Sequence, residues 1–125
     1  MLARHALREG MLVWHNHSVG NYKDQLQRLQ QQRKQIREQL AETEAEMKLL
    51  ISTIPYAGTP HGIAQDDIGI IIGLRRLAVA QWRSTGTTLA DALRNNPNDQ
   101  DITQNYGLTP DAVARLRKTN TQKQQ

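Results

Sequence analysis

The chain has 125 residues, a formal net charge of +4 and no Cys. This length suits one domain, or a small domain with an oligomerisation arm, and the lack of Cys excludes disulfides, Cys-ligated zinc and thiolate nucleophiles. Both ends of the chain are basic and residues 41–74 are acidic, which favours a polyanionic partner, most simply DNA, or else an acidic protein. Because no apolar run is long enough to span a membrane, we expect a cytoplasmic protein without a membrane partner, located in the host cytoplasm or the virion if it is viral.

Residues 1–18 are predicted to form a short N-terminal helix followed by a polar joint. The joint contains His15 and His17, whose spacing of two residues points the side chains to opposite sides of a helix. A metal site needs ligands that converge on one point, and no carboxylate lies nearby in the sequence. We therefore expect no metal here and no cofactor in the chain.

A heptad repeat runs from Val19 to Ile54 and predicts one long coiled-coil helix over residues 19–54. The seam positions are mostly apolar, with polar interruptions at Arg33 and Thr43 that can fix register or oligomer order. One short chain cannot cover such a seam, so we expect a homo-oligomer. The predicted oligomerisation residues are Leu26, Leu29, Arg33, Ile36, Leu40, Met47, Leu50 and Ile54, with Gly69 and Gly73 from the following helix.

The charge that flanks this seam changes sign along the helix. Lys23 and Arg37 flank its first part, whereas Glu44 and Glu46 flank its second part. An antiparallel contact would place basic flanks beside acidic ones, and a parallel contact would place like charges together. The sequence therefore favours antiparallel contact, either between two chains or within a folded-back hairpin.

Residues 55–63 contain two Pro and two Gly and predict a turn. A second helix is expected over residues 64–84, with apolar residues around nearly its whole circumference, so it should be buried on most sides. A strand over residues 68–73 is the alternative, because three consecutive Ile favour strands, but no second strand is evident to pair with it. Gly69 and Gly73 would let another helix approach closely.

Arg75, Arg76 and Arg83 fall toward the end of this second helix, where positive charge suits a helix C-terminus. The composition changes at Ser84-Thr85-Gly86, and residues 86–119 are predicted to form a third unit. Its expected parts are a short helix 89–95 capped by Thr87 or Thr88, a helix 99–106, a helix 110–119 that begins with Thr109 as N-cap, and a disordered tail 120–125.

The segment DQDITQNYGLTPDAVARLRK, residues 99–118, resembles the helix-turn-helix motif of bacterial and phage DNA-binding proteins. The two short helices of that motif cross closely at a turn with positive φ, and each buries one face against a third helix. Thr103 departs from the pattern, because that position usually holds a small residue such as Ala. The apolar and turn positions of the motif are filled in order by Ile102, Tyr106, Gly107, Leu108, Val113 and Leu116.

The resemblance implies that the helix starting at Pro110 enters the major groove of DNA. Arg115 is the best candidate for a base contact, because a guanidinium can pair bidentately with guanine, while Arg117 and Lys118 would lie nearer phosphates. The candidate DNA-binding residues are Thr109, Asp111, Ala114, Arg115, Arg117 and Lys118.

The expected fold class is all-α, with a long coiled-coil-type helix, an apolar helical hairpin partner and a small C-terminal helix-turn-helix-like unit of three helices. An enzyme is not expected, because no His has an evident carboxylate partner and no glycine-rich phosphate loop is present in the sequence. We expect an oligomeric DNA-binding protein, either a transcription regulator or a phage DNA-packaging recognition subunit. The alternatives are a structural or assembly protein of a virion or scaffold, and a coiled-coil adaptor that does not bind DNA.

Overall fold

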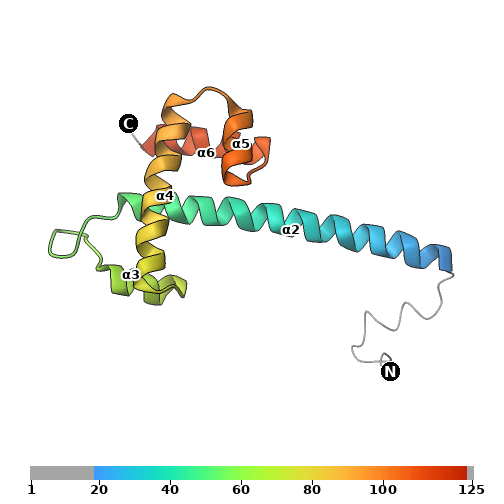
Figure 1. The fold of residues 1–125 in the computed structure, drawn as a ribbon, viewed down its shortest axis with the longest axis horizontal. Coiled ribbons are helices and arrows are strands. Elements are labelled where there is room, and N and C mark those ends of the chain that lie inside the picture. Colours follow the sequence, from blue (N-terminus) through green and yellow to red (C-terminus); the bar gives the residue numbers. More distant parts are fainter. Residues whose placement is uncertain (1–18, 124–125) are drawn as a thin grey trace. The chain divides into compact units, whose positions relative to one another are not determined.

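The computed structural model describes residues 19–123, and the side chains of residues 21–121. Over this range the chain is all-α, as predicted, with no strand. The predicted N-terminal helix and joint, with His15 and His17, lie outside the described residues. The helices are α2 (Val19–Thr53), α3 (Gln65–Ile72), α4 (Arg76–Asn95), α5 (Asp99–Tyr106) and α6 (Pro110–Lys123) (Figure 1).

α2 is the predicted long helix, and it ends two residues before Pro55. The carbonyl groups at its end are capped from α4, because the guanidinium of Arg83 donates to the carbonyl oxygens of Ile51 and Ile54 at 2.9 Å each. Arg83 was expected to compensate the dipole of its own helix. That expectation is wrong, since Arg83 lies in the middle of α4 and caps α2 instead.

The single helix predicted over residues 64–84 does not form. α3 ends at Gly73, which has a φ of 76°, in the left-handed region that Gly adopts without a Cβ penalty. The amides of Gly73 and Leu74 both donate to the carbonyl of Gly69, and the chain turns before α4 begins. Apolar periodicity does not reveal such a turn. The choice of helix over strand for residues 68–73 is confirmed as far as Ile72.

The turn at Gly73 changes which residues are covered. Ile70, Ile71 and Leu77 are exposed, so the expectation of burial on most sides is wrong for the single chain. Two helices that meet at a turn each pack one face, whereas one straight helix could have been buried on all sides. Arg75 and Arg76 lie at the N-terminus of α4 rather than at a helix C-terminus.

α4 continues without a break through residues 84–86, so the predicted boundary between a second and a third unit is wrong. Thr87 and Thr88 were expected to cap a new helix. Their hydroxyl groups instead donate to the carbonyls of Arg83 and Ser84, one turn earlier in the same helix.

Gly86 lies where α4 crosses α2 in the second half of α2. A Cβ on Gly86 would lie 1.9 Å from the carbonyl oxygen of Lys48 and 3.0 Å from the Cβ of Ser52. The two helix backbones therefore touch at this point, and only Gly leaves room for the contact.

Gly69 and Gly73 have roles within the chain's own fold, and the oligomer contact predicted for them stays a prediction. A Cβ on Gly69 would lie 2.4 Å from the carbonyl oxygen of Leu74, and Gly73 forms the turn. Ile54, also predicted to contact another copy, is partly buried against a cluster within the chain. The buried residues of that cluster are Ile51, Ile68 and Val79.

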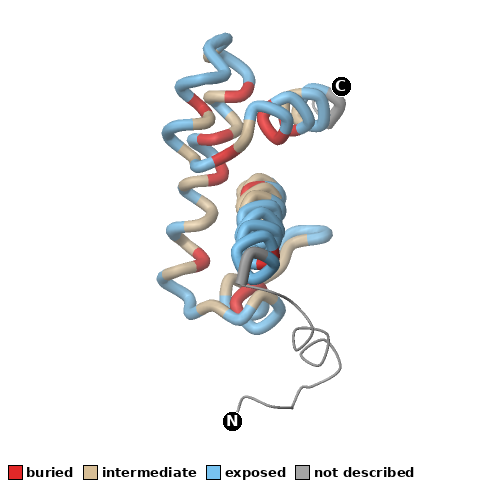
Figure 2. Tube along the Cα trace, turned by 90° about the vertical axis from the view of Figure 1, so that its right-hand side faces the viewer, coloured by how far each residue is buried: buried red, intermediate tan, exposed pale blue. Residues whose placement is uncertain are grey.

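The chain divides into two compact units, residues 1–37 and 38–125. The second unit contains two apolar clusters, and α4 contributes to both, so buried positions recur along its length (Figure 2). Val79 belongs to the cluster with α3, while Leu89 and Leu93 belong to a larger cluster with α5 and α6. The predicted C-terminal unit is therefore continuous with the apolar helix that precedes it.

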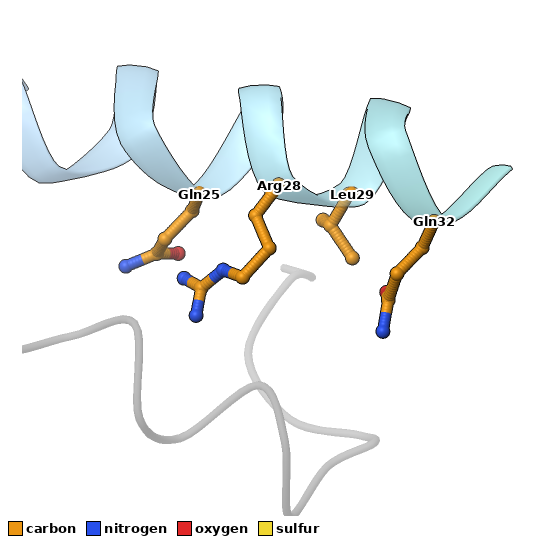
Figure 3. Close-up of a pocket in the computed structure, with 4 residues that line it drawn as sticks. All are labelled: Gln25, Arg28, Leu29 and Gln32. Atoms are coloured by element: carbon orange, nitrogen blue, oxygen red, sulfur yellow. The ribbon is translucent and has the colours of Figure 1, made fainter. Parts of the chain in front are cut away.

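The described part of the first unit is the beginning of α2, where most side chains are exposed. A hollow of about 210 Å³ is lined by Gln25, Arg28, Leu29 and Gln32, whose side chains project from one side of α2 (Figure 3). These four residues supply two amides, a guanidinium and one apolar group. They include neither a nucleophile nor a carboxylate.

Candidate nucleic-acid interface

α5 and the start of α6 form the predicted helix-turn-helix corner. The side chain of Asn98 caps α5 by accepting hydrogen bonds from the amides of Gln100 and Asp101, at 2.9 and 3.4 Å. Gly107 ends α5 with a φ of 66°, and its amide donates to the carbonyl of Thr103. The corner therefore has the positive-φ turn that the motif requires.

α6 begins as predicted and ends later than predicted. The hydroxyl oxygen of Thr109 accepts a hydrogen bond from the amide of Ala112 at 3.1 Å, which confirms Thr109 as the N-cap. The helix then continues to Lys123, so the expected disordered tail over residues 120–125 is wrong as far as Lys123. Polarity alone does not end a helix, and Gln122 and Lys123 have good helix propensity.

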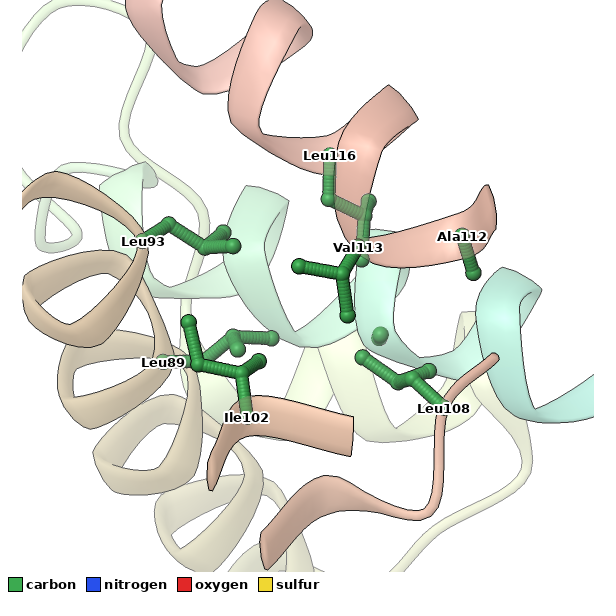
Figure 4. Close-up of a cluster of buried hydrophobic side chains, with 8 residues drawn as sticks. Leu89, Leu93, Ile102, Leu108, Ala112, Val113 and Leu116 are labelled. Atoms are coloured by element: carbon green, nitrogen blue, oxygen red, sulfur yellow. The ribbon is translucent and has the colours of Figure 1, made fainter. Parts of the chain in front are cut away.

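The inner faces of α5 and α6 pack on α4 (Figure 4). Every apolar position of the motif is buried or half-buried, and side chains from the three helices point toward one another. Ala45 of α2 also belongs to this cluster. The side chains labelled in the figure are Leu89, Leu93, Ile102, Leu108, Ala112, Val113 and Leu116.

Thr103, the residue that departs from the motif, is accommodated within α5. Its hydroxyl donates to the carbonyl of Gln100 at 2.8 Å, and its own carbonyl accepts from the amide of Leu108 at 3.1 Å. The extra polar group is therefore hydrogen-bonded, and the turn keeps its geometry.

The outward face of α6 carries Asp111, Ala114, Arg115 and Lys118, all of them exposed. Their spacing of three or four residues places them on one face of the helix. Four of the predicted DNA-binding residues are thus brought together, with two basic side chains and one acidic one. Thr109 is half-buried, and its hydroxyl is committed to the cap.

Arg115 is paired with Glu42 of α2. Its Nε and Nη2 donate to the two carboxylate oxygens of Glu42 at 2.7 and 2.5 Å, which is the bidentate geometry that carboxylates and guanine both accept. The hydrogen bond from Arg115 holds the pKa of Glu42 below its ordinary value and raises the pKa of Arg115. The Arg115 side chain remains 60 % exposed, so it could exchange Glu42 for another acceptor.

Arg117 holds the corner together from within. Its Nε donates to Asp99 at 2.8 Å, and its Nη1 and Nη2 donate to the carbonyls of Leu93 and Asn96 at 2.7 and 2.6 Å. The guanidinium thus ties the end of α4 to the start of α5. Its predicted place beside phosphates does not fit this arrangement, because these donors face the protein.

Sequence reasoning missed Glu42 as a neighbour of the candidate site. Glu42 and Arg115 are 73 residues apart, and both look like ordinary exposed helix residues in the sequence. The partners of Arg117 were missed for a related reason, since two of them are backbone carbonyls at a helix end. The cap by Asn98 has a local signal, because Asn before a helix start is a preferred N-cap.

Among residues 19–123, no group of three or more His, Cys, Asp or Glu side chains could hold a metal ion. Within the same residues, no helix is long and apolar enough to cross a membrane. No family model matches the chain, and no curated protein or solved structure shows significant similarity to it.

Proposed function

We propose that the protein is a cytoplasmic, oligomeric DNA-binding protein rather than an enzyme, and that it docks α6 in the major groove as a transcription regulator or a phage DNA-packaging recognition subunit. The observation that carries the proposal is the α5–α6 corner, closed at Gly107 and packed on α4, with one exposed face of α6 directed outward. The major groove admits a single α-helix presented in this way. An oligomer would present two such helices to neighbouring half-sites.

Within this proposal the side chains of α6 have different tasks. Lys118 is exposed and would attract phosphate, which contributes affinity without sequence preference. Arg115 would contact a base after leaving Glu42, because the fork that binds the carboxylate also fits the O6 and N7 atoms of guanine. Arg117 is no longer a DNA contact in the proposal, since it holds the corner.

The test is a salt series of fluorescence anisotropy measurements with the full chain and labelled duplex DNA. We expect Lys118→Ala to weaken binding to all duplexes and to reduce the log-log salt slope by about 0.9, the value for one phosphate contact. Lys34→Ala is the matched control, because it removes the same charge from an exposed position of α2. Arg115→Ala should weaken binding only to preferred sequences. Equal binding by all three variants and the unaltered chain would contradict the proposal, as would no binding at low salt.

A second candidate is a structural or assembly protein that does not bind DNA. It is favoured by one observation, namely that Arg115 and Arg117 are both engaged by groups of their own unit. Of the basic side chains described on α6, Lys118 on the outward face then remains to contact DNA. On this reading the α5–α6 corner is a purely structural element, and the acidic middle of the chain or its basic ends would contact a protein partner.

A further inference from the structure

The apolar seam of α2 remains exposed along much of the helix. Leu26, Ile36 and Leu40 are 65, 63 and 54 % exposed, and Leu29 and Leu50 are exposed as well. Large exposed apolar side chains that repeat along one stripe indicate a surface that is covered in the functional state. We propose that a second copy of this chain covers it, antiparallel, in the single register that places Arg33 of each chain opposite Thr43 of the other.

This register follows from the two polar seam residues. α2 is one helix from Val19 to Thr53, so the heptad register runs through it without interruption, with Arg33 at a first (a) position and Thr43 at a fourth (d) position. Antiparallel helices set a positions opposite d positions, so Arg33 and Thr43 can face each other twice in a symmetric dimer. The layers between and beyond them are then all apolar. They pair Leu26 with Leu50, Leu29 with Met47, and Ile36 with Leu40.

Other arrangements bury a charge against an apolar group or against a like charge. Sliding one helix by a heptad sets Arg33 opposite Ile36 or Leu50, and sliding it by two sets Arg33 opposite Leu29. An arginine buried in this way, without a polar partner, is costly. A parallel pair would set Arg33 against Arg33 of the other chain, where the two charges repel.

Flanking charges favour the same orientation. Lys23 and Arg37 flank the first part of the seam, while Glu44 and Glu46 flank the second part. In the antiparallel dimer the basic first half of each α2 lies along the acidic second half of the other, although Arg37, one residue from the centre of the register, lies beside Arg37 of the other chain. Glu42, a further acid of this stretch, is paired with Arg115 and is not needed for the contact.

The second unit offers space beside the later part of the seam. A hollow of about 240 Å³ there is lined largely by apolar groups, including Met47, Leu50 and Leu116. In the proposed register, Met47 and Leu50 face Leu29 and Leu26 of the other chain, and these side chains are of a size to enter the hollow. The inference deepens the oligomeric part of the proposed function and rests on that part alone, so it does not require DNA binding.

Single cysteines in the full chain test the register, because the natural sequence contains none. At a rise of about 1.5 Å per residue, Gln39 of one chain lies within about 3 Å, along the dimer axis, of Gln39 of the other chain. The corresponding separations are about 18 Å for Gln32 and about 15 Å for Thr43. Gln32 and Gln39 are exposed and lie outside the a and d positions, so a cysteine there should leave the fold and the seam intact. Thr43 is exposed in the single chain but belongs to the seam, so its variant is compared only if its oligomeric state matches that of the unaltered chain.

Each variant is treated with a short bismaleimide in the absence of DNA and analysed on a denaturing gel, after sedimentation equilibrium has established its oligomeric state. We expect Gln39→Cys to give covalent dimer in high yield, and Gln32→Cys and Thr43→Cys to give little. More dimer from Gln32→Cys or from Thr43→Cys than from Gln39→Cys would overturn the register, and similar amounts of dimer from all three variants would show a parallel pair. A monomer by sedimentation would overturn the interface itself. Because no DNA is present, none of these outcomes depends on whether α6 binds it.

Discussion

The substitution Gly86→Ala tests whether α4 and α2 cross in backbone contact. In an exposed helix interior this change is stabilising by about 1 kcal/mol, because Ala has a higher helix propensity than Gly. At Gly86 the new Cβ would lie 1.9 Å from the carbonyl oxygen of Lys48, whereas a relaxed C···O contact is roughly 3.3 Å long. The obstructing atoms belong to a helix backbone, which cannot rotate aside as a side chain can. α4 must therefore move away from α2 by more than about 1 Å.

Such a movement loosens the apolar clusters on both sides of the crossing, because α4 carries residues of each. Overpacking costs about 1–3 kcal/mol and occasionally more, and we expect it to exceed the gain in propensity. Gly86→Ala should lower the free energy of unfolding by about 2 kcal/mol, measured by urea denaturation followed by far-UV circular dichroism. Thr87→Ala is the control, since Thr87 is exposed and should change stability by less than about 0.5 kcal/mol. A higher urea midpoint for Gly86→Ala would refute the close crossing.

Three further predictions concern the second unit and the seam. Glu42→Gln should free Arg115 and so raise the affinity for preferred sequences in anisotropy measurements, and an unchanged affinity for them would argue against competition between Glu42 and DNA. The pKa of Glu42 is lowered from its ordinary value of 4.5 by the hydrogen bond from Arg115. The contribution of ionised Glu42 to stability is therefore fully present above pH 4.5 and is lost as the pH falls through the lowered value. Glu42→Gln should accordingly lose less stability than the unaltered chain in acid titrations. Arg117→Met should lower the free energy of unfolding, measured by urea denaturation, by about 1–3 kcal/mol, because partly buried carbonyls lose their donors. An unchanged free energy of unfolding would mean that the guanidinium does not hold the corner. Leu40→Lys should weaken assembly in sedimentation equilibrium, and a compact monomer for the unaltered chain would contradict this.

The sequence predicted the elements whose signals are local. The heptad repeat and Pro55 predicted α2 to within one residue, and the Thr109 cap with Gly107 predicted the α5–α6 corner. The roles predicted for two glycines were wrong. Gly73 was assigned to close packing and forms a turn, while Gly86 was assigned to a break and lies in a tight helix crossing. A missing Cβ serves both purposes, and only the position of the other helix decides between them.

The candidate site was predictable to the level of the helix and not to the level of its contacts. The spacing of Asp111, Ala114, Arg115 and Lys118 places them on one face of α6, and the structure shows them exposed there. The pairing of Arg115 with Glu42 depends on how α2 and α6 pack, which no local pattern encodes. The same holds for the carbonyl acceptors of Arg117, because every helix end offers such groups.

The continuity of α4 has a consequence for how the second unit unfolds. Val79 near one end of this helix and Leu93 near the other belong to different apolar clusters, and neither cluster is large. Loss of either cluster removes the packing that keeps part of α4 helical, and a fraying helix then withdraws its residues from the other cluster. The two should therefore melt as one cooperative step, with the amides in the middle of α4 exchanging with solvent only when the whole unit opens. A truncation at either end of the unit would on this basis be felt throughout it, and the α5–α6 corner would not survive as a separate fragment.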